Sequence, residues 1–407
     1  MGRKKEKERT PLVRENWVSN FNLIGEAVIN PDYTYKINER SEKSAWIYNS
    51  MNLGINCGEK CGTVYAEMMG GYSDEKQNVI YAHGKKEDGT DDFKNQIQVA
   101  WEDRDNPDIL DTIGDMCFIT VGLEVTNKGK TYYNKFLSEY DAIEYIQEHL
   151  ENGTTVNVKG NLKYSTYQGN TQVRKVITSI VLSKKEPEDY VARFTQTVLI
   201  DKDSASLKNI DKDKGVMYVD ARVLDYVKQI NGVEIKGQFP FDKQFEYKFK
   251  DLTNGDKCKK AYNTLFKVKK GVTQITFEGE LIESGAVVTL TYDDLPDDIK
   301  ELVEADVLTE EEAIARCTTN GSKERRMVLI RPQIKNVGDE DNKTPVIQKF
   351  EEKYDEEDLF FDIPDEEEVE ESDLDDDELS IDVDDESDDD TDEDDSDSDD
   401  MSWINEL

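Results

Sequence analysis

Basic and aromatic side chains that could hold a nucleic acid lie close together between positions 156 and 175. Along 156–164 apolar residues alternate with polar ones, as in a half-buried strand. Each polar residue is neutral or basic: Asn157, Lys159, Asn161 and Lys163. The following stretch adds Tyr164, Tyr167, Arg174 and Lys175. Basic side chains attract phosphates and aromatic rings stack on any base, so the pattern predicts a groove for single-stranded nucleic acid. Ordinary surface or core packing is the alternative for the tyrosines.

Three further groups of residues are candidates for the same chemistry. A predicted third strand adds Tyr132, Tyr133 and Lys135. On or near the long early loops are Trp46, Tyr48 and Trp101, for which core packing is an equal explanation. The second half of the chain interleaves Lys248, Lys250, Tyr262, Phe266 and Lys267, whose lysines a solvated helix face explains as well. We expect the first half to bind more tightly and the second half to extend the footprint or hold subunits together.

The elements that would position these side chains follow the same order twice. Each half has three β runs, a helix and two more strands, with helices expected over 139–151 and 257–268. This is the order of the OB-fold, in which the helix lies between the third and fourth strands of a five-stranded barrel. We predict a mainly β protein with two tandem OB-fold barrels, over 15–183 and 190–336, joined by the linker 184–189. An acidic helical insertion is expected over 292–322.

A short pattern also repeats between the two halves. Residues 156–162 and 275–281 share the order apolar, polar, apolar, polar, Gly, polar, Leu, and a predicted helix precedes each copy. The polar positions of the second copy are Thr276, Glu278 and Glu280, which would repel phosphate. The repeat supports a duplicated unit whose two copies differ in charge.

The two ends of the chain carry opposite charge. A mobile basic arm is expected over 1–14 and a disordered acidic tail over 337–407. Residues 351–407 have a formal charge of −32, whereas 1–350 carry only −8. The tail ends in an apolar tip: Met401, Trp403, Ile404 and Leu407. Such a tail would compete for the groove and recruit partners, and the arm would contact a neighbour's acidic surface to make binding cooperative. A merely solubilising tail is the alternative.

The composition narrows the class of protein. No apolar run reaches membrane-spanning length, and the N-terminus lacks the apolar core of a signal peptide. Five scattered cysteines fit a reducing cytoplasm, and with two histidines they predict neither a metal site nor a cofactor. No nucleophile motif, metal cluster or phosphate loop supports an enzyme.

Several stretches resemble the single-stranded DNA-binding (SSB) family. That family's fourth and fifth strands are similar to residues 156–169 and 176–182. Its first strand is similar to residues 21–25 followed by Asn30-Pro31, and its C-terminal peptide is similar to the acidic tail. Within the family the chain looks most like versions encoded by large DNA phages. The resemblance implies an OB-fold protein that coats single-stranded DNA in replication, recombination and repair, in the cytoplasm of an infected bacterial cell. This chain departs from bacterial members in ending with Leu407 instead of Phe and in having two units, so their oligomeric state does not carry over.

Two other functions stay open from the sequence. An acidic-tailed adaptor, or nucleic-acid mimic, would sequester a basic protein partner, which the modest charge of the body favours. An OB-fold protein that binds RNA is the other, because stacking grooves accept either sugar.

Overall fold

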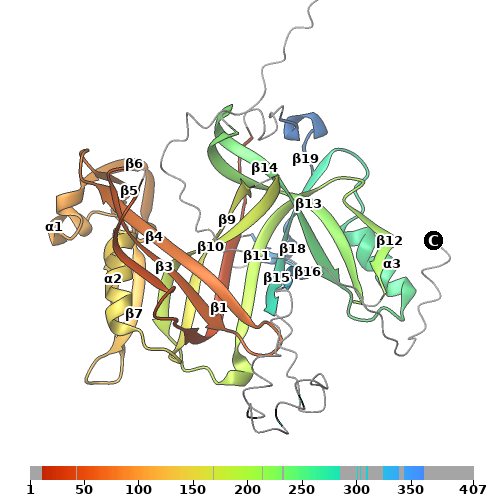
Figure 1. Ribbon diagram of the computed structural model, residues 1–407. Helices are drawn as coiled ribbons and strands as arrows, with labels where there is room; N and C mark the ends of the chain where they lie inside the picture. The colour runs from red at the N-terminus through yellow and green to blue at the C-terminus, as the bar shows by residue number, and fades with distance from the viewer. Residues whose placement is uncertain are drawn as a thin grey trace, which may run out of the picture.

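The computed structural model describes residues 12–42, 44–167, 169–212, 214–231, 233–284, 324–338 and 343–361, with 300, 303 and 309. These residues form a mainly β structure in which one 15-stranded sheet runs through two barrels (Figure 1). Two helices of eleven residues, α2 and α3, lie at opposite ends of the molecule (Figure 1).

The first half of the chain contributes ten strands and two α-helices. The strands are β1 (Ser19–Val28), β2 (Tyr35–Arg40), β3 (Trp46–Asn56), β4 (Thr63–Ser73), β5 (Val79–Lys85), β6 (Asp91–Ala100), β7 (Ile119–Val125), β8 (Thr131–Phe136), β9 (Thr155–Tyr167) and β10 (Asn170–Leu182). The helices are α1 (Pro107–Leu110) and α2 (Glu139–His149). Strands β1, β3, β4, β10 and β9 pair in a closed ring, with β4 and β10 parallel. The helix α2 lies between the third and fourth of them, so this unit is an OB-fold barrel.

The second half repeats this arrangement. Its strands are β11 (Val191–Ile200), β12 (Ala205–Asp211), β13 (Val216–Ile230), β14 (Val233–Lys248), β15 (Val272–Ser284) and β16 (Glu324–Pro332), with α3 (Gly255–Leu265). Strands β11, β13, β14, β16 and β15 close the second ring, again with one parallel pair, β14 and β16. The prediction of two tandem five-stranded barrels, each with a helix between its third and fourth strands, is confirmed.

The two barrels are joined edge to edge through their first strands. One edge of β1 pairs with β9, and the other pairs first with β11 and then with β3. The antiparallel pairing places Phe21 directly opposite Phe194, and both rings are buried. Figure 1 shows β1 and β11 side by side in the middle of the molecule. The barrels therefore share one continuous sheet.

Glycines in the repeated pattern explain why that pattern recurs. Gly160 lies opposite Phe21, and a Cβ on Gly160 would be 2.8 Å from the Phe21 ring. Gly279 lies opposite Phe194, and its Cβ would be 2.3 Å from that ring. Each fourth strand thus needs glycine where a phenylalanine of the first strand crosses it. The two positions are structurally equivalent, as the repeat predicts.

Three boundaries differ from the expectations. Residues 46–56, expected as loop, form β3, the second strand of the first barrel; their Asn, Ser and Gly content hides the strand. Arg14 is not mobile, because its guanidinium is bonded to Asp225 of β13. The acidic tail begins later than expected, since 343–361 fold against the body. They form β18 (Thr344–Ile347), paired with β17 (Ile334–Val337), then β19 (Lys349–Tyr354), paired with β15, and a short 3₁₀ helix, Glu356–Leu359.

Two expected segments fall outside the described residues. The insertion predicted over 292–322 lies outside them except for residues 300, 303 and 309. The tail from 362 to 407, including the tip residues Met401, Trp403, Ile404 and Leu407, also lies outside them.

Candidate nucleic-acid interface

The fourth strand of the first barrel has the alternation that the sequence predicts. Along β9, Val156, Val158, Leu162 and Tyr164 are buried, whereas Lys159, Asn161 and Lys163 are exposed. Alternate residues of a strand point to opposite faces of the sheet. One outer face of the barrel is therefore polar and positively charged.

Strand pairing extends this face across six strands. Lys135 of β8 lies opposite Thr120 of β7, Thr120 opposite Ser179 of β10, and Ser179 opposite Lys159 of β9. On the other side of β9, Lys159 lies opposite Asn22 of β1, and Asn22 opposite Arg193 of β11. Directly paired residues point to the same face, so three cations share one row of otherwise neutral side chains. We call this the basic row: Lys135, Thr120, Ser179, Lys159, Asn22 and Arg193.

Within the basic row the three cations are not equally free. Lys135 is bonded to the Asp115 carboxylate, with 3.1 Å between Nζ and Oδ1, and Lys85 binds the same oxygen at 3.3 Å. These bonds, that of Lys135 first, lower the pKa of Asp115. Lys159 and Arg193 are exposed and are in none of the ion pairs recorded among the described residues. The row is therefore most open to phosphate at Lys159 and Arg193.

Exposed aromatic rings also lie on the outer surface of the first half. Tyr133 is 58% exposed and lies against Gly122, where a Cβ would come within 3.0 Å of the ring. Tyr65, which the sequence did not single out, lies over Gly54 on the outer face of β3 and β4. Tyr167 is exposed beside the turn between β9 and β10. Rings in these places could stack on bases.

Tyr132 and Tyr133 do not act together. They are consecutive residues of β8, which was expected to be the third strand of the barrel. Instead, β8 forms a hairpin with β7, and β7 pairs with β10 of the barrel. Consecutive side chains point to opposite faces. Tyr132 lies opposite Glu124, whose carboxylate accepts a bond from Tyr145 of α2, so it faces the helix.

Several aromatic candidates are buried or half-buried and contact other residues of the fold. Tyr164 and Phe266 are 4% and 2% exposed, and burial raises the pKa of Tyr164. The hydroxyl of Tyr262 donates to the Ala205 carbonyl, 3.1 Å away. Trp101 is packed on Tyr72 and Tyr140, with the Arg104 guanidinium 4.3 Å from its ring centre. All four side chains make contacts within the fold, and whether any of them contacts a nucleic acid stays a prediction.

Three basic candidates of the first barrel are held by carboxylates. Arg174 is paired with Glu67, and Lys175 with Glu283 of β15 at 2.6 Å. Lys175 is only 10% exposed, so this pair joins the two barrels. Lys163 is 3.7 Å from Asp225 of β13 but keeps half of its side chain exposed. Lys163 alone of these three is open to phosphate.

The remaining candidates lie elsewhere. Trp46 and Tyr48 are half-buried on β3, opposite Ser73 and Gly71. In the second barrel, Lys248, Lys250 and Lys267 are exposed at the end of β14, in the turn after it and after α3. They are not in the basic row.

The described residues hold few groups for metal or thiol chemistry. They include no group of three or more His, Cys, Asp or Glu side chains able to hold a metal ion. Cys57 and Cys61 are buried, and this burial raises the pKa of both thiols. Among the helices of the described residues, none is long and apolar enough to cross a membrane.

Comparisons with known proteins gave the following similarities. A family model described as YorF matches residues 74–273, from the end of β4 to the start of β15. No curated protein matches the chain. The wild-type single-stranded DNA binding protein from Thermus aquaticus is similar at 10% identity and a TM-score of 0.29, over 66% of this chain and 87% of that chain. A deletion mutant of the same protein matches at 11% identity and a TM-score of 0.29, over 66% and 88%. The OB-fold assignment rests on the strand pairing described above.

Proposed function

We propose that the chain is a non-enzymatic single-stranded DNA-binding protein whose main contact surface is the basic row. The observation that carries this proposal is the alignment of Lys159 and Arg193, from different barrels, on either side of the neutral Asn22. On its other side Arg193 lies opposite Glu280 of β15, which pairs with Lys60. Neighbouring strands are about 4.8 Å apart, so the two cations lie about 10 Å apart along the row. That spacing suits a backbone that crosses the strands, with bases against Tyr133 and Tyr65.

The proposed role is largely independent of base sequence. Lysine and arginine contact phosphates, which are the same in every sequence, and tyrosines stack on any base. A role in coating DNA during replication, recombination and repair, in a phage-infected bacterial cell, is supported by the sequence resemblance alone. Self-association and the recruitment of replication proteins through the tail tip belong to the same proposal.

The acidic tail is proposed to compete with DNA for the basic row. Residues 362–407 hold 27 acidic residues and no Lys or Arg. The side chain of Phe361 contacts Phe239, which lies opposite Asp225 on the neighbouring strand. Asp225 is the residue that Lys163 approaches, so the tail leaves the body beside the polar face of β9. Its effective concentration at that face is high.

The test is a fluorescence titration of a labelled oligo-dT across a salt series, with the full chain and a truncation after Phe361. Cutting earlier would remove β18, β19 and Leu359, which is 4% exposed. We expect log affinity to fall linearly with log salt, by about 0.7 per phosphate contact. We expect the truncation to bind more tightly at low salt. Failure of both proteins to bind at every salt concentration would reject the proposal, and preference for oligo-rU would move it to RNA.

A second function is supported by a different surface. The outer face of β13 and β14 carries Asp220 and Asp242, and the cavity there adds Asp201 and Asp203. With the acidic tail, this face suits an adaptor that sequesters a basic protein. Capture of a basic protein by a chain that does not bind oligo-dT would favour that function.

A further inference from the structure

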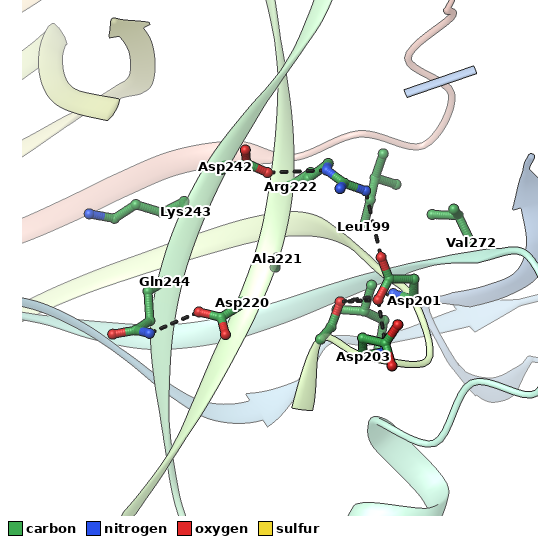
Figure 2. Close-up of a pocket in the computed structure, with 12 residues that line it drawn as sticks. Leu199, Asp201, Asp203, Asp220, Ala221, Arg222, Asp242, Lys243, Gln244 and Val272 are labelled. Atoms are coloured by element: carbon green, nitrogen blue, oxygen red, sulfur yellow. Dashed lines mark hydrogen bonds and ion pairs between the residues drawn. The ribbon is translucent and has the colours of Figure 1, made fainter. Parts of the chain in front are cut away.

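The second barrel has an acidic hollow where the first barrel has a neutral face. A cavity of about 400 Å³ is bordered by the end of β11, the following turn, and the outer faces of β13 and β14. Four carboxylates line it, and we call them the acidic face: Asp201, Asp203, Asp220 and Asp242. Figure 2 shows the Arg222 guanidinium between Asp242 and Asp201, with Asp220 beside Gln244.

The charges of the acidic face are only partly neutralised. Arg222 binds Asp242 at 3.1 Å and Asp201 at 3.6 Å. Asp220 accepts a bond from the Gln244 amide, which carries no charge. Lys243 also lines the cavity, but its side chain points away from the carboxylates (Figure 2). Four negative charges therefore face one positive charge, and a further cationic group would be favourable there.

The N-terminal segment of the chain runs directly to this cavity. Leu12 packs on the cluster of Leu199, Leu224, Val272 and Leu359, and Leu199 and Val272 also line the cavity. Two residues on, Arg14 is already bonded to an aspartate of β13, Asp225. The carbonyl of Val13 accepts a hydrogen bond from the Tyr354 hydroxyl at 2.9 Å, which holds the segment beside β19. Leu12, the first described residue of the basic arm, thus packs on a cluster that shares two residues with the lining of the acidic hollow.

The arm itself has the complementary charge and the necessary reach. Residues 1–11 contain five basic side chains, Arg3, Lys4, Lys5, Lys7 and Arg9, against two acidic ones. Arg9 is three residues from Leu12, which corresponds to about 10 Å of extended chain. Because the arm is tethered this close to the carboxylates, its cations have a high effective concentration at them.

We propose that the basic arm docks on the acidic face of the second barrel of its own chain, with Arg9 and Lys7 on Asp203, Asp220 and Asp242. The docked arm covers the outer face of β13 and β14, the face that oligonucleotides use in OB-folds. This assigns the outer face of β13 and β14 to holding the arm and leaves nucleic acid to the basic row, which includes Arg193 of β11. The inference does not depend on DNA binding.

Zero-length carbodiimide cross-linking of the full chain tests this inference, because it joins lysine amines to carboxylates in direct contact. We expect cross-links from Lys5 or Lys7 to Asp203, Asp220 or Asp242, identified by mass spectrometry. Mixing ¹⁵N-labelled and unlabelled protein distinguishes links within a chain from links between chains. Links found only between chains, or only to the tail beyond Phe361, would overturn the proposal.

Tryptic cleavage after Lys7 and Arg9 gives an independent readout. The test variant is Asp203→Asn/Asp220→Asn/Asp242→Asn, which keeps Asp201 because it accepts bonds from the Asp203 amide and the Ser204 hydroxyl. The matched control is Glu87→Gln/Glu102→Gln/Asp111→Asn, three exposed acids of the first unit. We expect cleavage about fivefold faster in the test variant at low salt, from the loss of surface ion pairs.

The control variant and the truncation after Phe361 should both be cleaved at the wild-type rate. High salt should remove the difference between wild type and the test variant, because it screens exposed charges. Equal cleavage of wild type and test variant at low salt would overturn the proposal. Faster cleavage in the truncation alone would also overturn the proposal, because the arm would then be bound to the tail.

Discussion

The two barrels have the same framework but different charges at equivalent positions. Lys159 lies opposite Ser179 in the first barrel, and the corresponding pair in the second is Glu278 with Arg331, ion-paired at 2.6 Å. On the second and third strands, Gly54 with Tyr65 corresponds to Asp220 with Gln244. At these positions the first barrel has an exposed lysine, Lys159, and a partly exposed tyrosine ring, Tyr65, where the second barrel has an ion pair and an exposed acid. In our proposal, the two barrels have different roles because a few surface residues differ between two copies of the same fold.

One ion pair occurs at equivalent positions in both barrels, which indicates a structural role. Arg174 pairs with Glu67 in the first barrel, and Arg326 pairs with Glu246 in the second. In each case the acid lies on the third strand and the arginine on the fifth, at the parallel pairing that closes the ring. Because the second barrel, which carries the acidic face, has this ion pair too, we infer that the pair stabilises the closed ring. We therefore assign Arg174 to structure, although its type and position suggested phosphate binding.

The largest effect is expected from the phenylalanines where the barrels meet. Phe21→Ala and Phe194→Ala should each lower the free energy of unfolding by about 3–5 kcal/mol, because each removes a fully buried ring. Urea unfolding monitored by circular dichroism measures this, with Phe93→Ala, at an exposed position, as the unaffected control. A large loss of stability in only one of the two variants would show that Phe21 and Phe194 do not have equivalent roles.

Exchanging the charges of the two barrels tests the assignment of the interface. Lys159→Glu/Arg193→Glu should weaken oligo-dT binding about tenfold or more at low salt and reduce the salt slope by about 1.4. Lys248→Glu/Lys250→Glu, outside the row, is the matched control. The reverse change, Glu278→Lys, should strengthen binding. If the control pair weakens binding as much as the row variant, the second barrel is the main site.

Removing the shared ion pair should separate structure from binding. Arg174→Met and Arg326→Met should each cost about 0.5–1 kcal/mol of stability, the range of partly exposed pairs. Neither should change the affinity for oligo-dT. A loss of affinity confined to Arg174→Met would return this residue to the interface.

The smallest effect is expected at Asp115. Asp115→Asn should free Lys135 and raise affinity about twofold, with a slightly steeper salt slope, since one more cation can reach phosphate. Its pKa is below the usual 3.8, so the stability it adds is present above pH 3.8 and is lost as pH falls through its folded-state pKa. The same titration of the variant, over a salt series, measures this change. An unchanged affinity would exclude Lys135 from the contact.

Much of the fold could be predicted from the sequence because alternation and turn residues are local signals. The helices over 139–149 and 255–265, the glycine-containing repeat and the duplicated strand order all follow from short-range pattern. The alternation along β9 also identified Lys159 and Lys163 correctly as outward-facing. Where local propensity was weak, as in the Asn- and Ser-rich β3, the strand was missed.

The membership of the site was decided by tertiary structure. Whether a tyrosine is open, like Tyr133, or buried, like Tyr164, depends on what packs against its strand. Whether a basic residue is free depends on carboxylates far away in the chain, such as Glu283 beside Lys175. The sequence by itself determined the kinds of elements and the charge of each segment. Only long-range pairing placed Arg193 in line with Lys159, because register between distant strands is fixed by the whole sheet and not by either strand alone.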